Sequence, residues 1–326
     1  MKAIKFFAIS AMAAAMITSC SSEDELSQSN YPSDNIIRVT AGVNNAKTRA
    51  EGAGTEMKNN FSLTIVNKNA PKYTYTDKVF SKSSGDWACS ETLLWQKSDA
   101  LVDIVAFAPA QTGKFNGVYA NGSIQPIAYS VASDQSTASD KNDLLYYYAK
   151  DFNPGESLDK GKLNIQFNHA FCMIDINVTL GTEFNKPSIP TTSPIIKVTL
   201  GGTKIAANVD VTNAASVVTA SEEAAATDIT TTQGTFDKAA DPEANAKSHF
   251  SCIAIPQTVG ANTFKVSLMT AGKLYEWTSD KEITLQSGYR YTLNLSMGND
   301  VVLLKGGSIS ATPWTEITSD KPLETD

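Results

Sequence analysis

Histidine and cysteine are scarce in this sequence, with 2 His and 4 Cys among 326 residues. Two histidines are too few for a multi-histidine metal centre, and the cysteines lie too far apart in the chain to form a zinc knuckle. Basic residues are also few, because 27 Lys and Arg stand against 34 Asp and Glu and give a formal net charge of −7. This acidic balance argues against binding to nucleic acid, which attracts a basic surface.

Motifs for catalysis are missing as well. The sequence contains no glycine-rich phosphate loop, no nucleophile elbow and no zinc signature. We therefore expect no enzyme activity, no cofactor and no bound metal. Hydrophobic residues make up 42% of the chain, which is enough to build a core, and the length suggests two domains or one large all-β domain.

The N-terminus predicts a lipoprotein signal. Two lysines precede a short apolar run at residues 6–17, which is too short to span a membrane. The run leads into Ile17-Thr18-Ser19-Cys20, which resembles the lipobox that signal peptidase cuts before an acylated cysteine. We expect residues 1–19 to be the signal peptide and lipidated Cys20 to anchor the chain in the outer membrane. The alternative is an ordinary secretory signal with a chance cysteine.

An acidic run, Ser21-Ser22-Glu23-Asp24-Glu25, follows the lipobox. It resembles the surface-export signal of lipoproteins from anaerobic Gram-negative bacteria, so we expect the protein to be surface-exposed. The alternative is a solvated tether, because short runs of like charge usually mean no more than that.

Alternation of apolar and polar residues with period two dominates the rest of the chain and predicts β-strands. It is clear at residues 61–65, 163–167, 264–268 and 289–295. Residues 101–108 are almost continuously apolar, as expected of a strand that is buried on both faces. The sequence therefore predicts an all-β fold built from antiparallel β-sandwiches.

Turn-forming residues cluster at 151–161 and suggest a division into two domains, residues 50–160 and 161–326. The parity of the apolar positions changes close to residues 170–172. Because a shift of one residue moves every side chain to the other face, we expect a bulge or bend there.

Helix signals are few. The best is a short capped turn at residues 221–226, inside an Ala- and Thr-rich stretch at 214–248 that we interpret as a long surface excursion. A hairpin turn is predicted at Ala271-Gly272. Residues 301–304 and 308–314 supply the last predicted strands.

Residues 36–43 form a good first strand, and a polar, Gly-rich segment at 44–54 follows it. This segment contains Arg49, one of only three arginines in the sequence, in a position where a trypsin-like protease can bind an extended backbone. A cut there would free the first strand and open an apolar groove, whose unpaired backbone groups invite a strand from another chain. The alternative is an ordinary linker that contains one arginine.

Short motifs follow one another along the mature chain after the lipobox: Lys47-Thr48-Arg49-Ala50, Leu94-Trp95, Asp143-Leu144-Leu145, Phe167-Asn168-His169-Ala170, Ile255-Pro256-Gln257-Thr258, Gly288-Tyr289-Arg290-Tyr291 and Pro313-Trp314. Their order and spacing resemble the fimbrillin family, the subunits of type V pili and their relatives in anaerobic gut and oral bacteria. The resemblance covers nearly the whole mature chain.

The resemblance implies two transthyretin-like β-sandwich domains, export as a lipoprotein, and a role as the stalk, tip or anchor subunit of an adhesive fimbria. It implies that residues 20–49 are a propeptide, that an arginine-specific protease cuts between Arg49 and Ala50, and that the product joins other fimbrillin subunits by strand exchange. Residues 301–326 become the candidate donor strand. Gly306-Gly307 interrupts that segment and its last residues are polar, which departs from a simple donor strand.

The expected burial or exposure of the two histidines and of the three cysteines other than Cys20 follows from their neighbours in the sequence. His169 shares parity with the apolar residues of its strand, so we expect it to be buried and hydrogen-bonded, whereas His249 has a surface position. We expect Cys89, Cys172 and Cys252 to be buried free thiols, with a bridge between two of them as the alternative.

A surface glycan-binding lipoprotein is the alternative function. Trp87, Trp95, Trp277 and Trp314 would then have to be exposed so that sugars can stack on them. Tryptophans in strands are more often core residues, so we expect these four to pack inside the domains.

Overall fold

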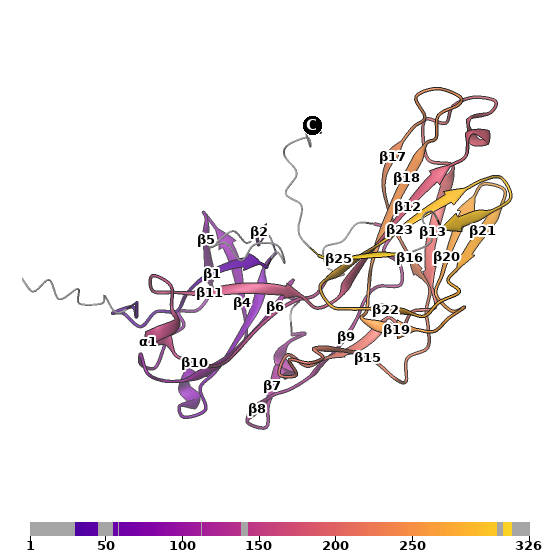
Figure 1. Ribbon diagram of the computed structural model, residues 1–326. Coiled ribbons are helices and arrows are strands. Elements are labelled where there is room, and N and C mark those ends of the chain that lie inside the picture. Colours follow the sequence, from indigo (N-terminus) through magenta and orange to yellow (C-terminus); the bar gives the residue numbers. More distant parts are fainter. Residues whose placement is uncertain are drawn as a thin grey trace, which may run out of the picture.

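The computed structural model describes residues 30–44, 55–57, 59–111, 113–137, 143–304 and 309–314. Regular structure in this part of the chain is almost entirely β-strand, and the strands fall into two groups that lie side by side (Figure 1). The predicted all-β fold is therefore confirmed. The described helical pieces are short, namely α1 (Pro154–Ser157) and the 3-10 turns η1 (Pro71–Tyr73), η2 (Asn116–Val118) and η4 (Thr182–Asn185). None of the helices in the described ranges is long and apolar enough to cross a membrane.

The first group is one mixed sheet. Its strands are β1 (Arg38–Val43), β2 (Thr55–Glu56), β3 (Phe61–Val66), β4 (Tyr75–Ser83), β5 (Asp86–Cys89), β6 (Val102–Ala108), β10 (Leu145–Phe152) and β11 (Lys162–His169). They are ordered β11-β10-β6-β3-β4-β5-β1-β2, and β1 also pairs with β11. The sheet therefore closes on itself around an apolar core.

The second group contains several smaller sheets around a second core. The largest is ordered β17 (Thr232–Asp237), β18 (Lys247–Ala254), β12 (Cys172–Leu180) and β23 (Tyr289–Met297), and both β24 (Val302–Leu304) and β25 (Ser310–Pro313) pair with β23. A second sheet is ordered β16 (Ile229–Thr230), β13 (Ile195–Gly201), β20 (Lys265–Thr270) and β21 (Leu274–Thr278). The remaining strands are β15 (Val218–Ala220), β14 (Ala206–Val209) and β9 (Ile127–Ser130) in one sheet, β19 (Gln257–Val259) with β22 (Ile283–Leu285), and β7 (Tyr119–Ala120) with β8 (Ser123–Ile124).

Antiparallel pairing predominates, as predicted. Among the named pairs of the described strands, β1 with β11 and β12 with β23 are the parallel ones. The hairpin predicted at Ala271-Gly272 is present between β20 and β21, where Met269 lies opposite Leu274. The transthyretin-like topology stays a prediction.

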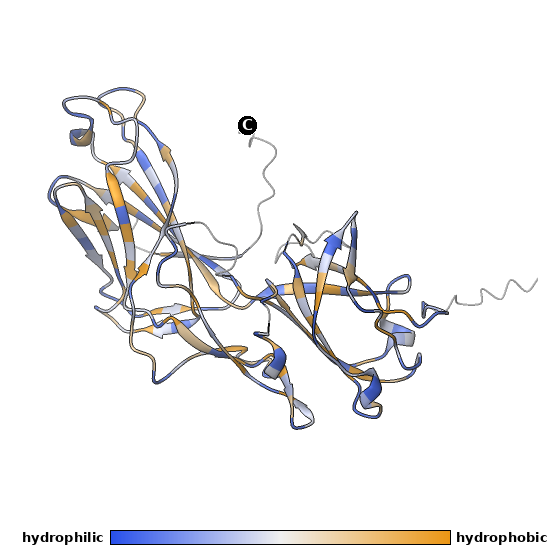
Figure 2. Ribbon diagram, turned by 180° about the vertical axis from the view of Figure 1, so that it is seen from behind, coloured by the Kyte–Doolittle hydropathy of each residue, from blue (hydrophilic) through white to orange (hydrophobic). Residues whose placement is uncertain are grey.

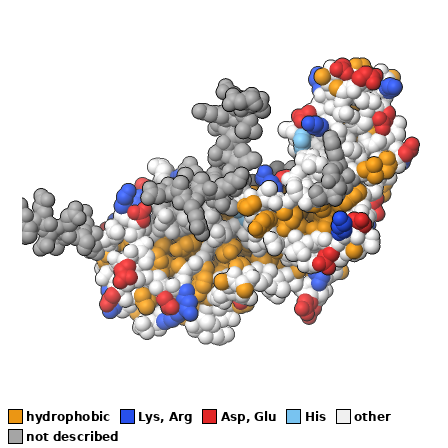
Figure 3. Space-filling view, viewed as in Figure 1, with side chains coloured by type: hydrophobic (Ala, Val, Ile, Leu, Met, Phe, Trp, Pro, Cys, Tyr) orange, Lys and Arg blue, Asp and Glu red, His pale blue; other side chains and the backbone are white. Residues whose placement is uncertain are grey.

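Period-two burial places the core. The even-numbered residues of β12 from Cys172 to Leu180 are buried, and so are the odd-numbered residues of β11 from Leu163 to His169. The change of parity occurs at a bend at residues 170–171, which confirms the predicted bend. Its cause is that the chain leaves the first sheet after β11 and enters another sheet at β12. Figure 2 shows hydrophobic residues interspersed with hydrophilic ones along the strands of both groups, and Figure 3 shows charged side chains mainly toward the rim of one face.

Strand pairing crosses the predicted boundary at residue 160 in both directions. β11 follows the boundary but pairs with β1 and β10, while β9 precedes it but pairs with β14. The turn formers at 151–161 belong to the connection between β10 and β11, which includes α1. The division into residues 50–160 and 161–326 stays a prediction.

The predicted helical turn at residues 221–226 is wrong, because that segment contains a turn and an isolated bridge. Helices this short are marginal without tertiary support. Here Lys204 Nζ donates hydrogen bonds to the carbonyl oxygens of Ser221 and Glu222. The excursion predicted at 214–248 is also partly wrong, since it contains β15, β16 and β17.

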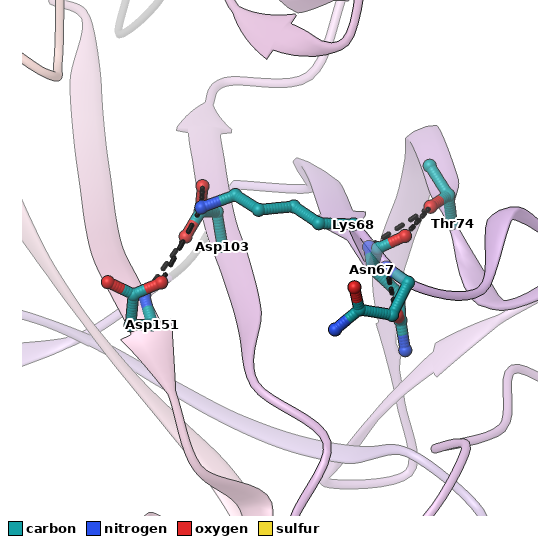
Figure 4. A network of polar contacts seen from close by, with 6 residues as sticks. Asn67, Lys68, Thr74, Asp103 and Asp151 are labelled. Atoms are coloured by element: carbon teal, nitrogen blue, oxygen red, sulfur yellow. Dashed lines mark hydrogen bonds and ion pairs between the residues drawn. The ribbon is translucent and has the colours of Figure 1, made fainter.

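A polar network connects β3, β6 and β10 at the end of the first sheet that lies opposite the bend (Figure 4). Lys68 Nζ, just after β3, lies 2.8 Å from Asp103 Oδ2 on β6, and Asp103 Oδ1 accepts a 2.9 Å hydrogen bond from the backbone N–H of Asp151 on β10. The hydrogen bond with Asp103 raises the pKa of Lys68. The buried carboxylate thus ties three strands together and has both a cation and a donor, as a buried charge requires.

Candidate strand-exchange site

β1 is paired along its whole length with β11. The two strands run parallel and in register from Arg38 opposite Lys162 to Val43 opposite Phe167. Just beyond β1, the backbone N–H of Asn44 donates to the carbonyl oxygen of Phe167 at 2.7 Å. The side-chain amide of Asn44 donates to Asn168 Oδ1 at 2.9 Å. These contacts fix the C-terminal end of β1 close to the bend.

The inward side chains of this segment fill the first core. Ile37, Val39 and Val43 are buried with exposed fractions of 6%, 4% and 5%. Their neighbours in the same core include Leu163, Ile165 and Phe167 of β11, as well as the aromatic residues Phe61, Trp87 and Phe80. Removing β1 would therefore expose an apolar groove as well as a strand edge.

The other edge of β1 is paired only in patches within the described residues. Val39 lies opposite Trp87 of β5, and Gly42 and Val43 lie opposite the two residues of β2. Trp87 packs on Phe61 with ring centroids 4.9 Å apart. β11 is therefore the main partner of β1, and its edge would carry the unpaired N–H and C=O groups if β1 left.

The segment at the start of β1, residues 34–38, makes a few polar contacts. The backbone N–H of Ile37 donates to the carbonyl oxygen of Leu93 at 2.9 Å. Arg38 forms an ion pair with Asp34 at 2.6 Å on the surface. The side-chain hydrogen bond from Arg38 lowers the pKa of Asp34 to about 2. Exposed pairs of this kind add little stability, so the buried apolar residues and the backbone ladder hold the strand.

The predicted processing residues Arg49 and Ala50 lie outside the described residues, and so does Cys20. Val43 is paired with Thr55, so the connection that contains Arg49 begins and ends at neighbouring positions of the sheet. Every named strand except β1 follows Arg49 in the sequence. A cut after Arg49 would consequently leave β1 held by non-covalent contacts alone.

The candidate donor segment at residues 301–326 is described in part. β24 and β25 both pair antiparallel with β23 of the same chain. Val302 is buried, whereas Val301 and Leu303 have exposed fractions of 50% and 59%. Gly306-Gly307 and the polar residues after Trp314 lie outside the described residues.

The histidines have the predicted positions. His169 is buried at 4% exposure, and its Nδ1 lies 2.7 Å from Asp143 Oδ2. His249 is partly exposed and contacts Asn177 and Asp237. No feature of the sequence alone identified Asp143 as the partner of His169, because the two residues come from different segments.

The tryptophans pack in the cores as predicted. Trp95 and Trp314 are buried, and the partly buried Trp87 and Trp277 pack on phenylalanines. Within the described ranges, this arrangement provides no exposed tryptophan platform for sugars.

The three described cysteines are free thiols. Cys172 and Cys252 are buried, as expected, and Cys89 is half-buried. Burial raises the pKa of the Cys172 and Cys252 thiols.

Comparison with solved structures supports this fold. A candidate cell adhesion protein of Bacteroides ovatus is 16% identical with a TM-score of 0.62, and the alignment covers 86% of this chain and 98% of that one. A candidate cell adhesion protein of Bacteroides uniformis is 15% identical with a TM-score of 0.55, covering 87% and 100%. A fimbrial protein of Bacteroides vulgatus is 15% identical with a TM-score of 0.54, covering 86% and 99%. No curated protein sequence matches this chain.

The family model described as fimbrillin-like matches residues 48–314, which is most of the chain. The match includes Lys47-Thr48-Arg49-Ala50 in part and runs to Trp314, so it covers the motifs on which the resemblance was based. The protein therefore belongs to the fimbrillin-like family, whose members are structural subunits of cell-surface fimbriae and not enzymes.

Proposed function

We propose that this chain is a fimbrial subunit that is exported as a lipoprotein, matured by cleavage after Arg49 and assembled by β-strand addition. Residues 1–19 are the signal peptide, Cys20 carries the lipid, and residues 20–49 are the propeptide. Before maturation the lipid holds the subunit on the surface of the outer membrane. An arginine-specific protease then releases the propeptide, and other fimbrillin subunits are the partners in the adhesive fibre.

The observation that carries this proposal is the position of β1. It fills the space between β11 and β5 with buried side chains, yet it lies on the N-terminal side of Arg49 while its partners lie on the C-terminal side. A strand in this position can be replaced by another strand without unfolding the remainder of the sheet. Backbone hydrogen bonds would supply much of the affinity, and the pockets of Val39 and Val43 would supply specificity.

Residues 301–326 of another subunit are the proposed source of the incoming strand. β24 and β25 support this assignment because each pairs with β23 alone in the described part of the chain. An edge segment of this kind can be removed without opening a second ladder. A strand from one subunit in the groove of the next makes a head-to-tail contact between two different surfaces. Repetition of this contact builds an open fibre unless the rotation from one subunit to the next closes a ring.

The test is proteolysis of the purified precursor with an arginine-specific protease. We expect a new N-terminus at Ala50, release of the fragment that contains β1, and formation of multimers. The Arg49→Ala variant is expected to keep β1 and to stay monomeric. Lys47→Ala is the matched control in the same segment and should be processed normally. Equal polymerisation of Arg49→Ala and the unaltered protein would refute the cleavage step.

A further inference from the structure

The end of β11 carries a second contact besides those to β1. The imidazole of His169 stacks on the indole of Trp314, with ring centroids 3.8 Å apart and planes inclined by 11°. His169 belongs to the first sheet, because it lies opposite Leu145 of β10. Trp314 directly follows β25 near the end of the described chain. The stack therefore joins the C-terminal strand to the sheet that contains the groove, and Figure 1 shows β25 at the junction of the two groups.

Trp314 is the principal side-chain anchor of this C-terminal segment. All four residues of β25 are exposed, and Ile309 is half-buried. Trp314 has an exposed fraction of 4%, and its backbone N–H donates to the carbonyl oxygen of Gly288 at 2.7 Å. Apart from its backbone ladder to β23, the segment at 309–314 is thus held by one buried side chain, Trp314, and by the partly buried Ile309. Burial of an indole is among the largest apolar contributions that one residue can make.

The ring of His169 is held in position for this stack. Its Nδ1 is 2.7 Å from Asp143 Oδ2, and the histidine side chain is only 2% exposed. A ring fixed at one nitrogen offers a constant face to the indole. His169 is therefore a positioning residue for Trp314.

The same end of β11 also holds the C-terminal end of β1. Asn44 bonds to Phe167 and Asn168, which are the two residues immediately before His169. Loss of β1 would remove both bonds next to the histidine. The two contacts are thus linked through adjacent residues of one strand.

We infer that the His169–Trp314 stack is a latch that keeps the C-terminal strand on its own subunit until β1 has left. This inference rests on the proposed function, because it assigns a state to the candidate donor strand. With β1 in place, the latch holds β25 on β23. Once β1 is lost, the end of β11 is released from Asn44, and the C-terminal strand becomes available to a neighbouring subunit. An unprocessed subunit would therefore be a poor donor as well as a closed acceptor.

Hydrogen–deuterium exchange of the uncleaved full chain tests the latch. In Trp314→Ala we expect the backbone N–H groups of residues 309–312 and 314 to exchange at least about tenfold faster than in the unaltered protein. Trp314→Phe retains an aromatic ring and should restore most of the protection. Trp277→Ala is the matched control, since this tryptophan lies in β21, which pairs with β20, and its ring packs on Phe264. Exchange of the β12 amides in the same samples reports whether each variant is folded.

The second measurement follows the same peptide in the unaltered protein before cleavage and after release of β1. We expect exchange at residues 309–314 to accelerate after release. Unchanged exchange in Trp314→Ala would refute the latch, and unchanged exchange after release would refute its link to β1. Both outcomes are separate from failure of the proposed function, which is read from the new N-terminus and from multimer formation.

Discussion

Val39 provides a direct way to weaken β1 without altering the cleavage site. It is 4% exposed, and it lies between Leu163 of β11 and Trp87 of β5. Val39→Ala removes two methyl groups, each worth about 0.8 kcal/mol, and leaves a small cavity, so we expect a loss of about 2 kcal/mol. In the intact precursor this loss lowers the free energy of unfolding. After cleavage it lowers the affinity of the β1 fragment for the groove by about 30-fold.

The assay uses precursor that has been cut after Arg49 under conditions in which the fragment remains bound. Dissociation of the fragment is followed by size-exclusion chromatography with mass spectrometry, and multimer growth is followed in parallel. We expect Val39→Ala to lose its fragment and to form multimers sooner than the unaltered protein.

Thr40→Ala is the matched control for Val39→Ala. Thr40 is the next residue of the same strand, but its side chain is exposed and makes one 3.3 Å hydrogen bond to Asn164. Its removal should change the affinity by less than about threefold, as is usual for an exposed site. If Val39→Ala and Thr40→Ala released the fragment equally fast, burial of β1 would not be what holds it in place.

Two further predictions concern the free thiols and one constrained glycine. In protein without the lipidated cysteine, a maleimide should modify Cys89 at least about tenfold faster than Cys172 and Cys252. The reason is that Cys172 and Cys252 are buried and burial raises the pKa of their thiols. Equal rates would contradict the burial of these two thiols. Gly202 has a φ of +86°, and a Cβ there would overlap the backbone carbonyl that faces it, whereas a Cβ at Gly272 meets open space. In urea denaturation, Gly202→Ala should therefore lower the free energy of unfolding by about 2 kcal/mol or more, and Gly272→Ala by less than about 1 kcal/mol. Similar losses in the two variants would show that the backbone at Gly202 is not constrained in this way.

Local patterning predicted strands well where one face of the strand is buried and the other is exposed. β11 shows this, because its odd-numbered residues are buried and none of its even-numbered residues is. β3 has the same alternation in sequence, but all six of its residues are buried. Ser62 and Thr64 are accommodated there by hydrogen bonds with Asp77 of β4. A polar residue in an alternating pattern therefore indicates a strand but does not by itself indicate exposure.

Long-range pairing could not be predicted from the period of the pattern. Nothing in residues 36–43 indicates that their main partner is β11, more than a hundred residues later, or that the two strands run parallel. The stack of His169 on Trp314 is also a product of tertiary structure, although parity did predict that His169 is buried. The position of Arg49 could be read from the sequence, whereas the place of β1 between β11 and β5 depends on the sheet order.

Replacement of β1 on assembly can be measured directly in the subunits of the assembled fibre. Fimbriae sheared from cells can be dissociated, and each subunit can be examined by N-terminal sequencing and intact mass. If β1 is replaced on assembly, this subunit begins at Ala50 and no fragment containing residues 36–43 accompanies it. Fibre subunits that begin at Cys20, or that retain the β1 fragment in equal amount, would contradict the claim that β1 is replaced on assembly.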